Sequence, residues 1–227
     1  MIALPVAILI NPSMPVPIHR SGARASGTFP PDSPVASTAG IEALTEPRDL
    51  GRARREIEAA GYKGERVVLL ASGDSAEGLR RANVLADMMK KVGLAVDFQM
   101  SDWGTTMQRV NKKDPVDQGG WSCTAVSLVA TDLMDPAVNS YLRGNGTDAP
   151  RFGWPTSARL EELREMWLEA PDLATRKRIA SEIQLQAFQD VPYIPLSLDY
   201  RFAAYHNDLV GVLEGFPVFW NVRRPIT

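Results

Sequence analysis

Short apolar runs alternate with helical stripes over residues 49–129, and this alternation constrains the fold more than any other feature of the chain. The run 67–71 is apolar throughout, as is typical of a strand buried on both faces, and 94–100 and 123–129 are further β-rich runs. The residues between these runs carry apolar side chains at helical spacing. Strands that alternate with helices predict an α/β fold with a mostly parallel sheet flanked by helices.

Capping residues indicate where the helices begin and end. The candidate N-caps are Asp49, Asp102, Ser157 and Asp172. Gly61 and Gly93 follow two of the helical stripes, where a left-handed residue commonly ends a helix. We therefore expect regular order to begin at Asp49, a third helix to cover 103–112, and the last helix to reach about Asp190.

Residues 191–198 form an extended segment after the last helix. Its two prolines, Pro192 and Pro195, suit a strand edge or a crossing segment, because proline cannot donate a hydrogen bond to a ladder.

The N-terminal stretch differs in composition from the rest of the chain. Seven of the 17 prolines fall within residues 1–34, and such a composition resists both helix and central strand. The apolar run 2–10 has the length of a signal-peptide core, but no Lys or Arg precedes it and Pro5 interrupts it. We therefore expect residues 1–31 to form an irregular proline-rich leader.

Charge and cysteine content exclude several classes of protein. The 227 residues include 25 basic and 27 acidic side chains, so the net charge of -2 gives no pull toward nucleic acid. A single cysteine excludes an intrachain disulfide and a thiolate-rich metal site. The sequence also lacks the standard motifs of phosphate-binding loops, zinc proteases, serine hydrolases and dinucleotide-binding folds. No cofactor or metal is expected.

Two carboxylates stand close together at Asp132 and Asp135. Their spacing allows acid/base catalysis, which would make the chain a small α/β enzyme domain. An aspartate that precedes a proline, as Asp135 precedes Pro136, is also typical of a turn or cap. Both interpretations remain open on spacing alone.

Several blocks of the sequence together resemble one known family. They are EPRDL at 46–50, AAGYKG at 59–64, DLMDP at 132–136, DVPYIPL at 190–196 and GFPVFWNV at 215–222. In this order and spacing they resemble the extracellular solute-binding proteins of family 5, the dipeptide-, oligopeptide- and nickel-type receptors of ABC importers.

The resemblance implies a binding protein without catalysis, built of two α/β lobes that close over a solute. Family members are about twice as long as this chain, and the matching region is their C-terminal half. Residues 32–227 are therefore expected to form the C-terminal lobe of a type II periplasmic-binding-protein fold, with the N-terminal lobe missing. The implied partners are a small solute, most simply a peptide, and the membrane permease of the importer. The implied location is the periplasm.

The resemblance also carries over one site residue. In peptide-binding relatives an aspartate at the place of Asp132 pairs with the α-ammonium group of the ligand. Val129 and Ala130, just before it, are expected to line the same site. Many relatives carry a tryptophan there, where this chain has Leu128 and Val129. Trp121 or Trp103 is then a candidate for the aromatic wall, although an aromatic beside a strand is more often part of the core.

The identity of the solute stays open on the sequence, and opines, sugars and nickel chelates are alternatives to peptides. A third interpretation is a non-functional truncated remnant. In the family fold the last strands return toward the missing lobe, so 193–198 and 216–220 are expected to lack partners. Exposed apolar strands of this kind favour self-association.

Overall fold

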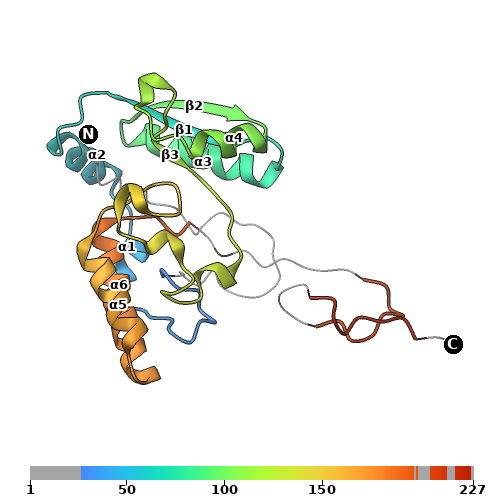
Figure 1. The fold of residues 1–227 in the computed structure, drawn as a ribbon. Helices are drawn as coiled ribbons and strands as arrows, with labels where there is room; N and C mark the ends of the chain where they lie inside the picture. Colours follow the sequence, from blue (N-terminus) through green and yellow to red (C-terminus); the bar gives the residue numbers. More distant parts are fainter. Residues whose placement is uncertain (1–26, 197, 199–204, 214–217, 226–227) are drawn as a thin grey trace.

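The computed structural model describes residues 27–196, 198, 205–213 and 218–225. A small sheet with its helices lies above a helical hairpin, and the segment after residue 205 stands away from both (Figure 1). The expected leader lies outside the described residues as far as residue 26.

The sheet has three parallel strands in the order β2-β1-β3. The strands are β1 (Arg66–Ser72), β2 (Ala95–Ser101) and β3 (Cys123–Thr124). β1 and β2 pair from Arg66↔Ala95 to Ser72↔Ser101. Three helices lie next to the sheet, namely α2 (Leu50–Ala59), α3 (Ala76–Lys91) and α4 (Trp103–Val110). The predicted α/β class with a parallel sheet is confirmed.

The central strand is buried on both faces, as its unbroken apolar run predicts. On one face, Leu69 packs in a cluster with Leu85 and Met89 of α3. On the other, Val68 and Leu70 pack with Val110 at the end of α4. Alternate residues of β1 therefore hold the two faces of the layer together.

The predicted caps are also confirmed. The side chains of Asp49, Asp102, Ser157 and Asp172 each accept a hydrogen bond from a backbone N–H in the first turn of the helix that follows. Gly61 has a φ of +90°, and the N–H of Tyr62 donates to the carbonyl of Ile57 at 3.3 Å. This 6→1 bond is the Schellman ending that a left-handed glycine permits.

The helical part consists of α5 (Ala158–Glu169), α6 (Leu173–Asp190) and the short α1 (Glu42–Thr45). Its core contains Leu160, Leu163 and Ile183, together with Phe29 from the N-terminal segment. The expectation that order begins at Asp49 is therefore wrong. The N–H of Thr28 donates to Gln184 Oε1 at 3.0 Å. The two residues lie far apart in the sequence, so local sequence patterns could not predict this contact.

The third strand is shorter than predicted. β3 pairs with β1 only at Leu69↔Cys123 and Leu70↔Thr124, and the expected strand over 123–129 is wrong beyond Thr124. β1 continues for two residues beyond this pairing, to Ser72, so the end of β1 does not set the length of β3. The chain then leaves the sheet, and Arg81 Nη1 of α3 donates to Ser127 Oγ at 2.7 Å.

The chain between the sheet and α5 is built of short 3₁₀ turns. They are η2 (Ala130–Leu133), η3 (Ser140–Leu142) and η4 (Gly146–Asp148), and a further 3₁₀ turn, η1 (Val116–Gln118), precedes β3. The helix predicted over 103–112 ends earlier, at Val110, where Asn111 caps it.

The segment after α6 lies outside any ladder where it is described, as its prolines predict. Tyr193 nevertheless has partners, contrary to expectation. Its hydroxyl donates to the Thr28 carbonyl at 2.8 Å and accepts from Asn139 Nδ2 at 3.0 Å. Burial raises the pKa of the Tyr193 hydroxyl, which therefore stays protonated as a donor.

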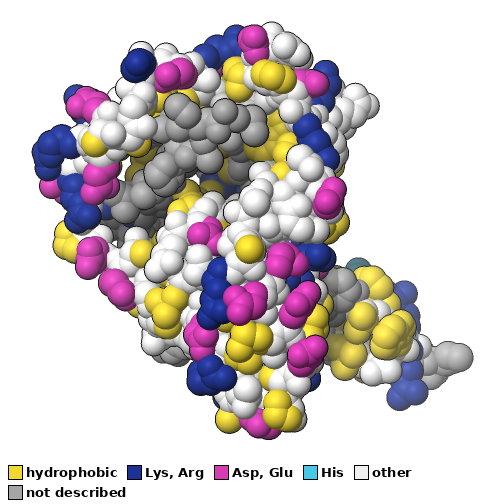
Figure 2. Space-filling view, turned by 60° about the vertical axis from the view of Figure 1, so that its left-hand side comes forward, with side chains coloured by type: hydrophobic (Ala, Val, Ile, Leu, Met, Phe, Trp, Pro, Cys, Tyr) yellow, Lys and Arg dark blue, Asp and Glu magenta, His cyan; other side chains and the backbone are white. Residues whose placement is uncertain are grey.

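In the described part of the tail beyond residue 205, Val210 and Arg223 form an isolated antiparallel bridge. Phe219 and Trp220 on it are 76% and 89% exposed. Figure 2 shows hydrophobic side chains gathered on this tail, whereas acidic and basic side chains intermingle over the helical part. In the portion of the chain that the structure describes, no helix is long and apolar enough to cross a membrane.

Candidate functional site

A row of aromatic rings connects the sheet to the helical part. Trp121 meets Phe152 edge-on at 6.0 Å between ring centroids, and Phe152 meets Tyr141 at 5.8 Å. Tyr141 in turn meets Tyr193 at 6.1 Å. Trp121 and Phe152 pack on the cluster around Val110, and Tyr193 packs on the core of α5 and α6. We call these four residues the aromatic row.

Trp121 is partly exposed, but its polar group is already used. The indole N–H donates to the carbonyl of Val110 at 3.1 Å, which fixes the ring against the end of α4. Trp154 flanks Trp121 at 6.3 Å and has a φ of +45°, a backbone conformation uncommon for a non-glycine residue. Such conformations concentrate at functional sites, where the surrounding structure holds them.

Asp132 lies in η2 with its carboxylate exposed to solvent. Among the described residues the carboxylate has no hydrogen-bond or ion-pair partner. The pKa of the Tyr141 hydroxyl is raised, mainly by burial, and the negative charge of Asp132 adds to this rise while Arg151 opposes it.

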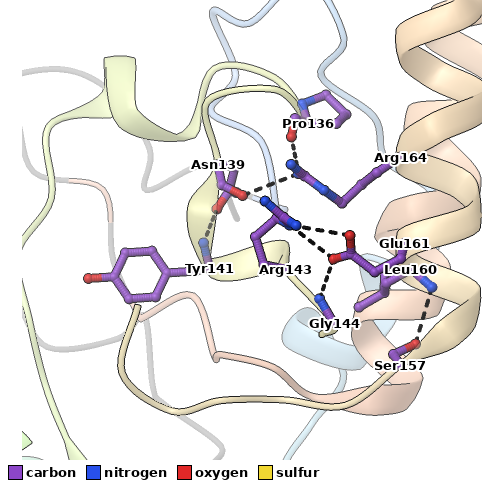
Figure 3. A network of polar contacts seen from close by, with 9 residues as sticks. All are labelled: Pro136, Asn139, Tyr141, Arg143, Gly144, Ser157, Leu160, Glu161 and Arg164. Atoms are coloured by element: carbon purple, nitrogen blue, oxygen red, sulfur yellow. Dashed lines mark hydrogen bonds and ion pairs between the residues drawn. The ribbon is translucent and has the colours of Figure 1, made fainter. Parts of the chain in front are cut away.

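The loop that carries Tyr141 is fastened to α5 by charged side chains (Figure 3). Glu161 accepts from Arg143 Nε at 3.1 Å and from the N–H of Gly144 at 2.6 Å. Arg164, only 7% exposed, donates from Nη1 to the carbonyls of Pro136 and Asn139. The ring of Tyr141 is directed away from the helix in this view.

Burial lowers the pKa of the Arg164 guanidinium, and Glu161 opposes that shift by its charge. An arginine keeps its proton at any physiological pH even so. Arg164 therefore acts as a permanent donor to two carbonyls of the loop.

Asp135 is a turn residue. Its Oδ1 accepts from the N–H of Ala137 at 2.8 Å and from that of Val138 at 3.2 Å. The turn interpretation of this residue is confirmed. Because the carboxylate is engaged with the backbone, it offers no support for the alternative in which Asp132 and Asp135 form an acid/base pair.

The other predicted site residues divide into two groups. Val129 is 50% exposed and Ala130 is exposed, and both lie on the segment that leads to Asp132. Trp103 stands at the start of α4, where its backbone N–H donates to Asp74 Oδ2 at 2.6 Å. Its ring takes no part in the aromatic row. Trp121, and not Trp103, therefore belongs to the aromatic row, and the grouping of these residues with Asp132 stays a prediction.

Sequence reasoning missed four members of this neighbourhood, namely Tyr141, Arg151, Phe152 and Trp154. They lie in a stretch of 3₁₀ turns without hydrophobic period, so no local signal marked them. Among the described residues, no three His, Cys, Asp or Glu side chains gather as a metal site.

Comparison of this sequence with known proteins supports the resemblance to a family of solute-binding proteins. The probable peptide ABC transporter periplasmic-binding protein of Sinorhizobium fredii is 32% identical over 177 residues, which are 78% of this chain and 33% of that protein. The resemblance to the solute-binding proteins of family 5 is confirmed. The chain spans about a third of the length of that solute-binding protein. No family model matches the chain.

Solved structures of solute-binding proteins share the fold. The dipeptide-binding protein of Pseudoalteromonas sp. SM9913, in complex with Met-Leu, has a TM-score of 0.67 and 18% identity, over 89% of this chain and 40% of that one. The periplasmic binding protein AgaA of A. tumefaciens, in complex with agropinic acid, has a TM-score of 0.63 and 18% identity, over 82% and 38%. The predicted relation to the periplasmic-binding-protein fold is thereby confirmed for part of such a protein.

Proposed function

We propose that this chain is part of the substrate-binding component of an ABC importer and that it captures peptides or similar small solutes for a membrane permease. The match to a peptide-type solute-binding protein over 78% of the chain carries the proposal. The proposed location of the full-length protein is the periplasm, as the name of that relative indicates. Binding without chemical turnover is the proposed activity.

The geometry around Asp132 supports a cationic group as one end of the solute. An exposed carboxylate without a protein partner is free to accept charge-assisted hydrogen bonds from an ammonium group. Val129, Ala130 and Trp121 are proposed to provide the apolar surface beside it. Apolar and aromatic side chains beside a few polar or charged groups are the usual lining of a small-molecule site.

We further propose that residues 32–227 form one of the two lobes between which such proteins hold a solute. The solved relatives are matched over 40% and 38% of their own lengths, which fits one part of a larger clamp. Affinity measured on this chain alone is then expected to be weaker than that of a complete two-lobed protein.

The test of the proposed function is a titration of the full chain with solutes. Two-dimensional ¹⁵N–¹H spectra are recorded with Met-Leu, a tetrapeptide, an opine, a trisaccharide and a nickel–histidine complex. We expect peptide-induced shifts at Ala130, Asp132 and Tyr141 that saturate with concentration. A chain that shows no saturating shift with any of these solutes up to 10 mM would contradict the proposal and favour a non-functional remnant.

Self-association through the tail is a separate proposal, supported by the exposure of Phe219 and Trp220. Light scattering after size exclusion is expected to show a mass that grows with concentration, and Phe219→Ser with Trp220→Ser should reduce it to that of one chain. Leu168→Ser, at an exposed apolar position of α5, is the matched control and should leave the association intact. A native chain of constant monomer mass would contradict this proposal.

A further inference from the structure

The loop 132–141 leads from Asp132 to the aromatic row, and near its start it is fastened to the N-terminal part of the described chain. The hydroxyl of Ser33 donates to the carbonyl of Met134 and accepts from the N–H of Val35 at 3.0 Å. Ser33 is only 7% exposed. It therefore holds the loop backbone two residues beyond the proposed site carboxylate.

The hydroxyl of Tyr193 holds the other end of this loop. It donates to the carbonyl of Thr28 at 2.8 Å and accepts from Asn139 Nδ2 at 3.0 Å. A phenol has one hydrogen to donate, and because Thr28 receives it, only the NH₂ group of Asn139 can face the hydroxyl. The amide oxygen of Asn139 is thereby turned toward the N–H of Tyr141, from which it accepts at 3.2 Å (Figure 3). The Tyr193 hydroxyl thus sets the orientation of the amide that caps η3.

The polar groups in these contacts are buried with their partners. Asn139 is 0% exposed and Thr28 is 3% exposed, so water does not reach them in place of a lost partner. A buried polar group that loses its partner costs free energy, and the members of such a network depend on one another. The position of the loop is therefore coupled to that of the N-terminal segment.

We infer that the hydroxyls of Ser33 and Tyr193 are positioning groups, which hold the loop 132–141 in the arrangement that binds the solute and do so without contacting the solute. This inference rests on the proposed function. The affinity of a site falls in proportion to the fraction of molecules whose site is in the binding arrangement. Loss of one of these hydrogen bonds is expected to lower that fraction, and with it the affinity, by about 2- to 10-fold.

The chain offers a matched control for each hydroxyl. The hydroxyl of Tyr62 donates to the carbonyl of Glu65 at 2.7 Å and accepts from the N–H of Ala95 at 2.7 Å, so Tyr62→Phe removes the same kind of contacts beside the sheet. The hydroxyl of Ser37 accepts from that of Ser181 on α6 at 2.9 Å. Ser37→Ala therefore removes a hydroxyl from the same N-terminal segment at a position that does not hold the loop.

The experiment measures the affinity of the full chain for Met-Leu by titration calorimetry, and the hydrogen exchange of the Tyr141 amide without solute. Tyr193→Phe and Ser33→Ala are each expected to weaken Met-Leu binding by about 2- to 10-fold. Tyr193→Phe is also expected to speed exchange of the Tyr141 amide. Tyr62→Phe and Ser37→Ala should leave the affinity and this exchange rate unchanged. A role in stability alone would lower the free energy of unfolding in all four variants without weakening Met-Leu binding in any.

The outcomes separate this inference from the proposed function. If the native chain binds Met-Leu and Tyr193→Phe binds it equally well, or if Tyr62→Phe weakens binding as much, the positioning role is wrong although the chain binds peptides. Unchanged exchange of the Tyr141 amide in Tyr193→Phe also overturns it. If Tyr193→Phe does not fold, equal affinities of Ser33→Ala and Ser37→Ala overturn it instead. If the native chain binds no peptide, the proposed function fails and the inference fails with it.

Discussion

Replacing Arg164 with methionine is expected to lower the free energy of unfolding by about 1–3 kcal/mol, because the buried carbonyl of Pro136 loses its donor. The carbonyl of Asn139 loses the same arginine but keeps the N–H of Leu142. Methionine fills much of the same volume, so the cost comes from the unsatisfied acceptor rather than from a cavity. Urea denaturation, followed by fluorescence and circular dichroism, measures the change.

Arg159→Met is the control for this substitution, since Arg159 lies on the exposed side of the same helix. It is expected to change the free energy of unfolding by less than about 0.5 kcal/mol. A change equally small for Arg164→Met would show that the loop before α5 is held without this arginine. An altered denaturant slope would instead indicate a change in the cooperative unit.

Asp132→Asn is expected to weaken peptide binding by about 10- to 150-fold, which corresponds to the 1.5–3 kcal/mol of one charge-assisted hydrogen bond. Asparagine keeps the shape of the side chain and removes its charge, so the fold should remain intact. The affinity for a free peptide and for its N-acetyl derivative is measured on both chains. The derivative lacks the ammonium group and is expected to bind both equally.

The matched control is Asp117→Asn, an exposed aspartate in η1. It removes the same net charge and should leave the affinity unchanged. If both variants lose the same amount of peptide affinity, the loss would be due to the change in the overall electrostatic field of the protein and not to a contact of Asp132. Unchanged affinity for every bound peptide in Asp132→Asn would remove Asp132 from the site.

Local sequence correctly predicted the elements that are stabilised by residues close together in the chain. A capping carboxylate or hydroxyl, such as Asp49 or Ser157, bonds the first turn of its own helix. The run of apolar residues in β1 is enough to predict a strand that is buried on both faces. In both cases the residues that decide the structure are neighbours in the chain.

The elements that were missed depend on distant partners. The buried position of Phe29 depends on α5 and α6, more than 120 residues away, and the burial of Tyr193 depends on Thr28 and Asn139. β3 stops at Thr124 although β1 continues to Ser72, so the β-propensity of residues 125–129 does not decide its length. The aromatic row is assembled in the same way, since Trp121 is linked to Tyr141 through Phe152, 31 residues further along the chain than Trp121.

The buried clusters of this chain share no residue. One lies among α5, α6 and the N-terminal segment, and the others cover the two faces of the sheet. Regions with separate interiors can open separately. The aromatic row contacts the cluster of α5 and α6 and the cluster around Val110. If a solute binds to these rings, as the proposed function requires, we expect it to favour the arrangement in which the rings meet. Such a solute would then restrict the movement of the sheet relative to the helices.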